Sequence, residues 1–187
     1  MRNGHGTPVT SCPVAASADA VLGECERFVS GLSDGAFRAP SRVLPGGTVG
    51  KHVRHSVDHF AALLAGHGGR EIVDYDRRRR DVPMETDRTL AIECVREVRA
   101  RLRSLGPNDM GSPVTVRVML GAEGASAELG STLGRELAFA AHHAVHHHAM
   151  MRAIAEEHGH GAPTGFGKAP STAAHEAAMA ATDGGTH

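Results

Sequence analysis

Five histidines lie inside a long apolar segment of the sequence, between positions 142 and 148. Such a segment favours a helix, and residues four apart on a helix lie on the same face. His143 and His147 have this spacing, and His146 lies beside them. Two imidazoles so placed can bind one transition-metal ion without distorting the helix. The segment therefore predicts a helix over about residues 131–157 that carries part of a metal site.

A second group of histidines lies about ninety residues earlier, at His52, His55 and His59. Their segment also has helical periodicity: Thr48 can cap its start, and apolar residues over positions 49–64 form a stripe. The histidines lie about a third of a turn from this stripe, at the margin of the buried face. A groove between two helices can open there, so this group is expected to supply a further ligand.

The histidines also have an ordinary explanation. A single histidine on a helix is usually solvated or simply hydrogen-bonded, and 14 histidines in 187 residues produce some close pairs by chance. Two helix-spaced groups within apolar helices make the metal site the stronger interpretation. His142 and His148 point to other sides of their helix and are interpreted as surface residues or as residues that support the ligands.

Glu136 lies two turns before His143 on the same helix face. There it could orient a ligand histidine, act as a base, or serve as a weak fourth ligand. It also lies in the first turns of the predicted helix, where a negative charge suits the helix dipole. Both interpretations stay open at this point.

The composition excludes several classes of function. Charge is balanced, with 20 basic and 21 acidic residues, so no global field attracts nucleic acid or a membrane surface. No apolar stretch reaches the length of about 18 residues that a membrane span needs, and the first residues lack the apolar core of a signal peptide. We therefore expect a cytoplasmic protein that acts on a small molecule.

One helical domain is expected over residues 13–160. Residues 1–12 and the tail over 161–187 are expected to be mostly disordered, with a short ordered piece near 166–172. A β-branched, alternating segment over about 113–129 predicts a β-hairpin or an extended excursion before the last helix. The fold class is all-α, an antiparallel four-helix bundle of up-down-down-up type, and its helices are expected over residues 14–33, 48–66, 85–105 and 131–157.

The two histidine segments resemble those of the DinB / YfiT-like superfamily of metal-binding four-helix bundles. In that family a ligand histidine lies seven positions after a small hydroxyl residue at a helix start, as His55 lies after Thr48. Asp58 follows where related sequences often have an acidic residue, and positions 143–151 resemble the family's HxxxH followed by small and apolar residues. The resemblance implies the metal ligands His55, His143 and His147. His59 and His146, which lie one helical turn from His55 and His143, are further possible ligands by their spacing.

The resemblance implies several kinds of activity. Three neutral imidazoles leave coordination positions for substrate, and zinc fits them, with nickel, iron or manganese as alternatives. The leading hypothesis is a metal-dependent enzyme that transfers a low-molecular-weight thiol to an electrophile. A hydrolase of a small amide or ester, with Glu136 or Asp58 as base, is the second. A non-catalytic metal binder or sensor is the third, and a homodimer is a further expectation.

Four arginines in a row, over residues 77–80, lie in a polar connection between the second and third predicted helices. A charge run in a loop is usually a solvated face. Acidic residues flank this run, however, which favours a paired network or an anion pocket beside the metal. Arg77 and Arg79 are therefore the candidate substrate contacts, and Lys168 and Ser171 are weaker ones.

Overall fold

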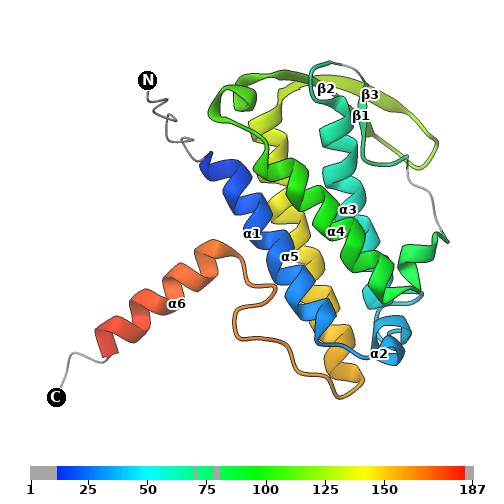
Figure 1. Cartoon of the computed structure of the whole chain (residues 1–187), viewed down its shortest axis with the longest axis vertical. Helices are drawn as coiled ribbons and strands as arrows, with labels where there is room; N and C mark the ends of the chain where they lie inside the picture. The colour runs from blue at the N-terminus through cyan, green and yellow to red at the C-terminus, as the bar shows by residue number, and fades with distance from the viewer. Residues whose placement is uncertain (1–11, 70, 78–80, 184–187) are drawn as a thin grey trace, which may run out of the picture.

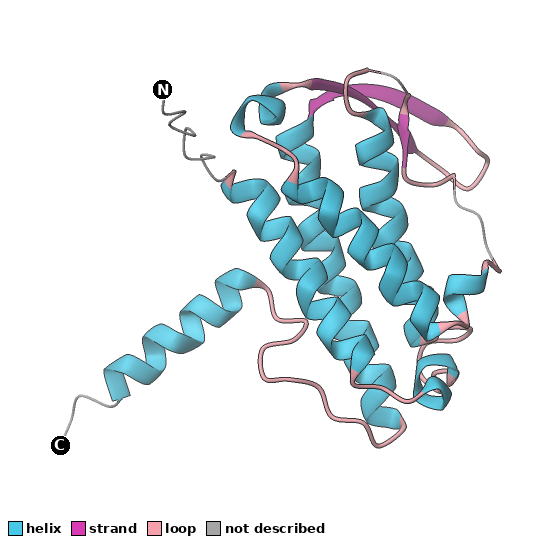
Figure 2. Ribbon diagram, in the orientation of Figure 1, coloured by secondary structure: helices cyan, strands magenta, loops and turns pink. Residues whose placement is uncertain are grey.

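The computed structural model describes residues 12–69, 71–77 and 81–183. These residues form a mostly helical protein with a small three-stranded sheet (Figures 1 and 2). The helices are α1 Pro13–Ser30, α2 Asp34–Arg38, α3 Val49–Gly66, α4 Arg88–Arg103, α5 Leu133–Glu157 and α6 Pro170–Asp183. The strands are β1 Val73–Asp74, β2 Pro113–Met119 and β3 Ser126–Thr132, and two short 3-10 helices are η1 Pro83–Glu85 and η2 Pro107–Gly111.

Four long helices, α1, α3, α4 and α5, pack against one another around the apolar core. In Figure 1, α1 and α5 run down the view while α3 and α4 run up it. Helix α5 contacts both α1 and α3, and α4 contacts both of these from the other side. The expected predominance of helix is therefore confirmed. Most of the largest fully buried side chains are aliphatic or aromatic, among them Phe37, Phe60, Leu22, Leu63, Leu102, Leu133 and Leu137.

The sheet departs from a purely all-α class. Its strand order is β1-β2-β3, with β1 parallel to β2 and β2 antiparallel to β3. Strands β2 and β3 form the hairpin that the alternating pattern predicts, and Figure 2 shows the sheet lying across one end of the long helices. Val114 and Val116, both on β2, have buried side chains. Strand β1 joins through the register Val73↔Val116 and comes from a segment expected to be only a polar connection.

Side-chain caps fix where the long helices begin. The hydroxyl of Thr48 accepts a hydrogen bond from the Lys51 backbone N–H at 3.1 Å, as expected for α3. Thr132 caps α5 in the same way, through the Arg135 N–H at 3.3 Å. Such caps satisfy backbone donors that have no partner within the helix. Helix α4 begins later than expected because Asp87 is its cap and the residues before it form η1.

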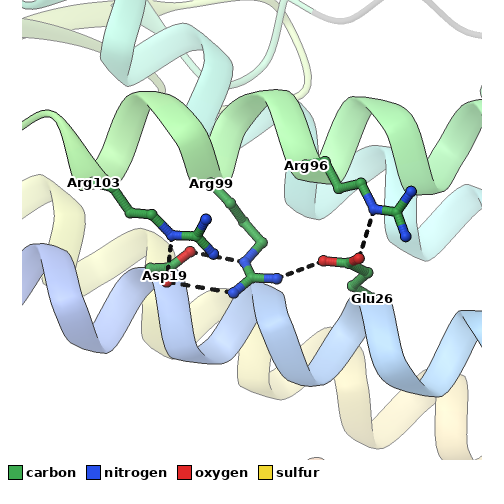
Figure 3. Close-up of polar contacts among 5 residues, drawn as sticks. All are labelled: Asp19, Glu26, Arg96, Arg99 and Arg103. Carbon is green, nitrogen blue, oxygen red and sulfur yellow. Dashed lines mark hydrogen bonds and ion pairs between the residues drawn. The ribbon is translucent and has the colours of Figure 1, made fainter.

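Helices α1 and α4 are joined by a ladder of ion pairs (Figure 3). Arg99 lies between two carboxylates of α1 and contacts both Asp19 and Glu26, with Nε 2.8 Å from Asp19 Oδ1. Arg103 adds a second contact to Asp19, at 3.1 Å, and Arg96 adds one to Glu26, at 2.7 Å. The ladder fixes the register of the two helices through charge-assisted hydrogen bonds.

The two ends of the chain were expected to be mostly disordered. Residues 1–11 lie outside the described residues, so this expectation is not addressed there. In the tail, Phe166 is buried and stacks on Phe28 with ring centroids 4.3 Å apart, and α6 extends away from the other helices (Figure 1). No helix among the described residues is long and apolar enough to cross a membrane.

Candidate metal centre

The two groups of histidines meet where α3 packs along α5. The Nε2 atom of His55, on α3, lies 2.9 Å from Nε2 of His143, on α5. One helical turn further along α5, Nε2 of His147 lies 3.0 Å from the same atom of His143. Imidazoles from two distant parts of the chain therefore converge, as the sequence analysis expected.

A compact group within this cluster could hold a metal ion. His55, His59 and His143 each offer a ring nitrogen, and these nitrogens all lie within 4.8 Å of one another. The His59 ring stacks on that of His143, with centroids 4.3 Å apart. His59, which sequence reasoning gave as a further possible ligand, thus lies on one side of the His55–His143 pair. His147 lies beside the same pair, with its ring centroid 4.3 Å from that of His55.

The chemistry of these donors fits a transition metal. Bonds of about 2.0–2.1 Å in a tetrahedron place two ligand nitrogens about 3.3 Å apart. The observed separations of 2.9 and 3.0 Å are close to that spacing. Burial, with a smaller contribution from the neighbouring histidines, lowers the pKa of His147 to about 3. The ring of His147 is therefore neutral near pH 7, which is the form that binds a metal.

One hydrogen bond fixes the orientation of His59. Its Nδ1 lies 3.0 Å from the backbone carbonyl oxygen of His55, which can only accept. Nδ1 must therefore carry the proton, and the lone pair of the neutral ring is on Nε2. A metal-binding histidine is commonly held in this way by a bond from its other ring nitrogen.

The other histidines of α3 and α5 lie in three kinds of environment. His52 lies at the edge of the cluster, with Nδ1 2.8 Å from Nδ1 of His147. His142 and His146 are exposed, although the His146 ring is 5.9 Å from that of His147. His148 is fully buried and stacks on Phe166 at 4.6 Å, so it is not a surface residue. Burial lowers the pKa of His148 to about 4.

Glu136 is buried and is linked to the cluster through Tyr75. Its carboxylate accepts hydrogen bonds from Tyr75 at 2.9 Å, Ser131 at 2.7 Å and Arg135 at 2.6 Å. The Tyr75 ring stacks on that of His59, with centroids 4.8 Å apart. Burial alone would raise the pKa of Glu136, but the hydrogen bonds from Ser131, Arg135 and Tyr75 lower it. The carboxylate is thus held charged, behind the histidines.

Tyr75 was not among the residues that the sequence pointed to. It comes directly after β1, two positions after the buried Val73, and is itself buried. Phe139 lies near it, with ring centroids 5.6 Å apart, and Phe139 also stacks on His143 at 5.8 Å. The side chain of Phe139 is 40% exposed. These rings form an aromatic wall beside the histidines.

A cleft of about 770 Å³ lies between α3, β1, η1 and α4, and none of the clustered histidines is among the described residues that line it. Tyr75 lines it, as do Asp58 and Arg77. Asp58 is paired with Arg54, whose guanidinium Nη1 is 3.1 Å away, and Arg54 also pairs with the buried Glu85. Of the two arginines expected to contact substrate, Arg77 therefore lies at a cleft, and Arg79 lies outside the described residues.

The site and fold together define a mostly helical protein with a histidine cluster, between two long helices, that could hold a metal ion. A family model described as the DinB superfamily matches residues 17–151. The chain therefore belongs to the DinB superfamily, which confirms the resemblance seen in the two histidine motifs.

Two further comparisons add little to this assignment. A stretch of 105 residues, 56% of the chain, is 32% identical to part of FK506-binding protein 5 of the fungus Rhizopus delemar. The match covers only 27% of that curated relative's length. No solved structure matches the chain.

Proposed function

We propose that this chain is a metal-dependent enzyme of the DinB superfamily, built as an antiparallel four-helix bundle, that transfers a low-molecular-weight thiol to an electrophilic small molecule. One observation carries the proposal: three histidines from two helices bring their ring nitrogens together. Nε2 of His143 lies 2.9 Å from Nε2 of His55 and 3.0 Å from Nε2 of His147. His55 and His143 are partly buried and His147 is buried, and titratable groups gathered in this way are more common at functional sites than elsewhere.

The proposed ligands are His55, His143 and His147, with His59 as a candidate fourth. His55 and His143 belong both to this set and to the compact group with His59, so they are the centre of the site. A set of neutral imidazoles suits zinc best, and it also accommodates nickel, iron or manganese. His146 is exposed and is the weakest candidate.

A bound divalent metal would supply one chemical effect, lowering the pKa of a thiol so that it is a nucleophile near neutral pH. The chain's own residues would do the rest. Phe139 and Tyr75, whose rings lie 5.6 Å apart, would limit the access of water on one side of the histidines. Arg77, at the cleft that Tyr75 also lines, and Arg135, which lies over the Phe139 ring at 5.7 Å, would attract the carboxylate groups of a small thiol.

The contacts of the two candidate bases favour the transferase over the hydrolase. A general base must be able to accept a proton from water. Glu136 already accepts three hydrogen bonds, which lower its pKa, and Asp58 is paired with Arg54. Both carboxylates thus already accept hydrogen bonds from protein groups, which makes each of them a weaker base toward water. The third alternative, ion buffering, would need several weak sites rather than one cluster.

The test begins with elemental analysis of the full chain, purified without chelators or a His tag. We expect about one metal ion per chain, lost on His55→Ala and on His143→Ala but kept by His142→Ala, whose ring is exposed on the same helix. The metal-loaded protein should then consume an electrophile only with a small thiol present, and a chelator should stop it. Turnover without any thiol would support the hydrolase instead. Several weakly held ions that tolerate both substitutions would support buffering.

A further inference from the structure

His52 is the one histidine of α3 that the proposed ligand set does not use. It lies on the first turn of the helix, and its Nδ1 is 2.8 Å from Nδ1 of His147 on α5. The two rings are tilted by 39°, with centroids 5.1 Å apart. At this distance the two nitrogens share one hydrogen bond, so one ring donates and the other accepts.

The opposite nitrogen of His147 decides which ring donates. Nε2 of His147 faces Nε2 of His143 at 3.0 Å, inside the cluster. A neutral imidazole carries one proton, so Nε2 of His147 offers a lone pair only when its proton is on Nδ1. His147 is then the donor toward His52. With the opposite arrangement, a proton on Nε2 of His147 would point into the site and prevent metal binding.

We infer that His52 is a positioning residue for His147: it accepts the Nδ1 proton of His147 and thereby directs the Nε2 lone pair toward the cluster. This inference rests on the proposed function, because it needs His147 to be a metal ligand. His59 offers a parallel, since its Nδ1 proton is held by the backbone carbonyl of His55. One ligand candidate is thus oriented by backbone and the other by a second imidazole.

The surroundings of His52 hold its ring in place. Nε2 of His52 is buried and has no hydrogen-bond partner among the residues that the structure describes. A Cβ atom at Gly47 would lie 3.4 Å from that nitrogen, so the preceding loop closes over the ring. The Ser41 N–H donates to the Gly47 carbonyl oxygen at 2.9 Å, and the Ser41 hydroxyl donates to Glu157 of α5 at 2.7 Å. The hydrogen bond to His147 is thus the polar contact that the side chain of His52 makes among the described residues.

Three variants test the inference through metal affinity. His52→Ala should weaken zinc or cobalt binding about 10- to 100-fold, the usual cost of losing a residue that orients a ligand. His52→Asn should restore most of the affinity, because its amide oxygen takes the place of Nδ1 and accepts the same proton. His52→Gln should not, since its amide lies one bond further out. His142→Ala is the control on α5, and thermal melting checks that each variant folds.

Two readouts do not depend on activity. The absorption spectrum of the Co²⁺-loaded protein should change in His52→Ala and return in His52→Asn. Nitrogen-15 NMR of the wild-type chain should find the proton of His147 on Nδ1, with or without zinc. Unchanged affinity and spectrum in a folded His52→Ala protein would overturn the inference, and so would a proton on Nδ1 of His52. If the wild type binds no metal, the proposed function fails, whereas the NMR result still decides which ring donates.

Discussion

The hydroxyl of Tyr75 donates a hydrogen bond to Oε2 of Glu136 over 2.9 Å, and both groups are buried. Tyr75 comes directly after β1 and Glu136 lies on the first turn of α5, so the bond fastens the sheet to the helix that carries His143 and His147. While its hydroxyl is bonded to Glu136, the ring of Tyr75 stacks on the ring of His59. The sheet is therefore part of the support of the histidine cluster.

Tyr75→Phe should separate these two contacts. It keeps the ring against His59 but removes one donor from the buried carboxylate, so we expect a loss of about 1–3 kcal/mol in the free energy of unfolding. Urea denaturation measures this loss. Metal content should stay near that of the wild type, whereas Tyr75→Leu, which removes the stack as well, should lower both. Equal stability of Tyr75→Phe and the wild type would mean that the hydrogen bond contributes nothing.

The four central histidines should differ in how much metal binding depends on them. His55 and His143 belong to both possible sets of three, so His55→Ala and His143→Ala should each abolish tight binding. His59→Ala and His147→Ala each leave one of these two sets intact, so they should weaken binding without abolishing it. Isothermal titration with zinc gives the four affinities. Complete loss in only one of the flanking variants would identify the third ligand and would contradict a four-histidine site.

A close approach of backbone should make Gly50 irreplaceable. A Cβ atom there would lie 2.1 Å from the backbone oxygen of Glu85, so α3 and η1 must separate to admit it. Gly50→Ala should therefore cost about 1–3 kcal/mol or more, in the range of an overpacked core. Gly35→Ala is the matched control, because its nearest neighbour would lie at 3.8 Å. Thermal melting of both proteins checks the contrast, and equal melting temperatures would refute it.

The helix spacing of the histidines could be predicted from sequence because it depends only on the turn of a helix. The sequence could not decide between His59 and His147 as neighbours of the His55–His143 pair. That choice depends on how α3 and α5 are rotated against each other and on hydrogen bonds such as the one from His59 to the His55 carbonyl. The burial of His148 likewise depends on Phe166, which comes from the segment after the helix.

Tyr75 was missed for a related reason. A strand of two residues has almost no signal of its own, and β1 exists because Val73 pairs with Val116, far along the chain. Only that pairing brings the tyrosine against His59 and Glu136. The hairpin itself could be predicted, since alternation along β2 is local.

The ladder between α1 and α4 predicts how the protein responds to acid. Burial alone would raise the pKa values of Asp19 and Glu26, but hydrogen bonds from the arginines outweigh it and lower both below their ordinary 3.8 and 4.5. In the unfolded chain these carboxylates take up protons at a higher pH than in the fold. The stability they contribute is therefore complete above about pH 4.5 and is lost as the pH falls through their folded pKa values.

Arg99→Leu should remove most of this contribution, because Arg99 contacts both carboxylates. At pH 7 we expect a loss of about 1–2 kcal/mol, since the pairs are only partly buried. Below pH 3 the difference from the wild type should shrink, because the wild type has lost the same interactions. Urea denaturation over pH 2.5–7 gives both curves. Arg152→Leu breaks an exposed pair within α5 and should follow the wild type at every pH, so a constant difference for Arg99→Leu would point to lost packing rather than charge.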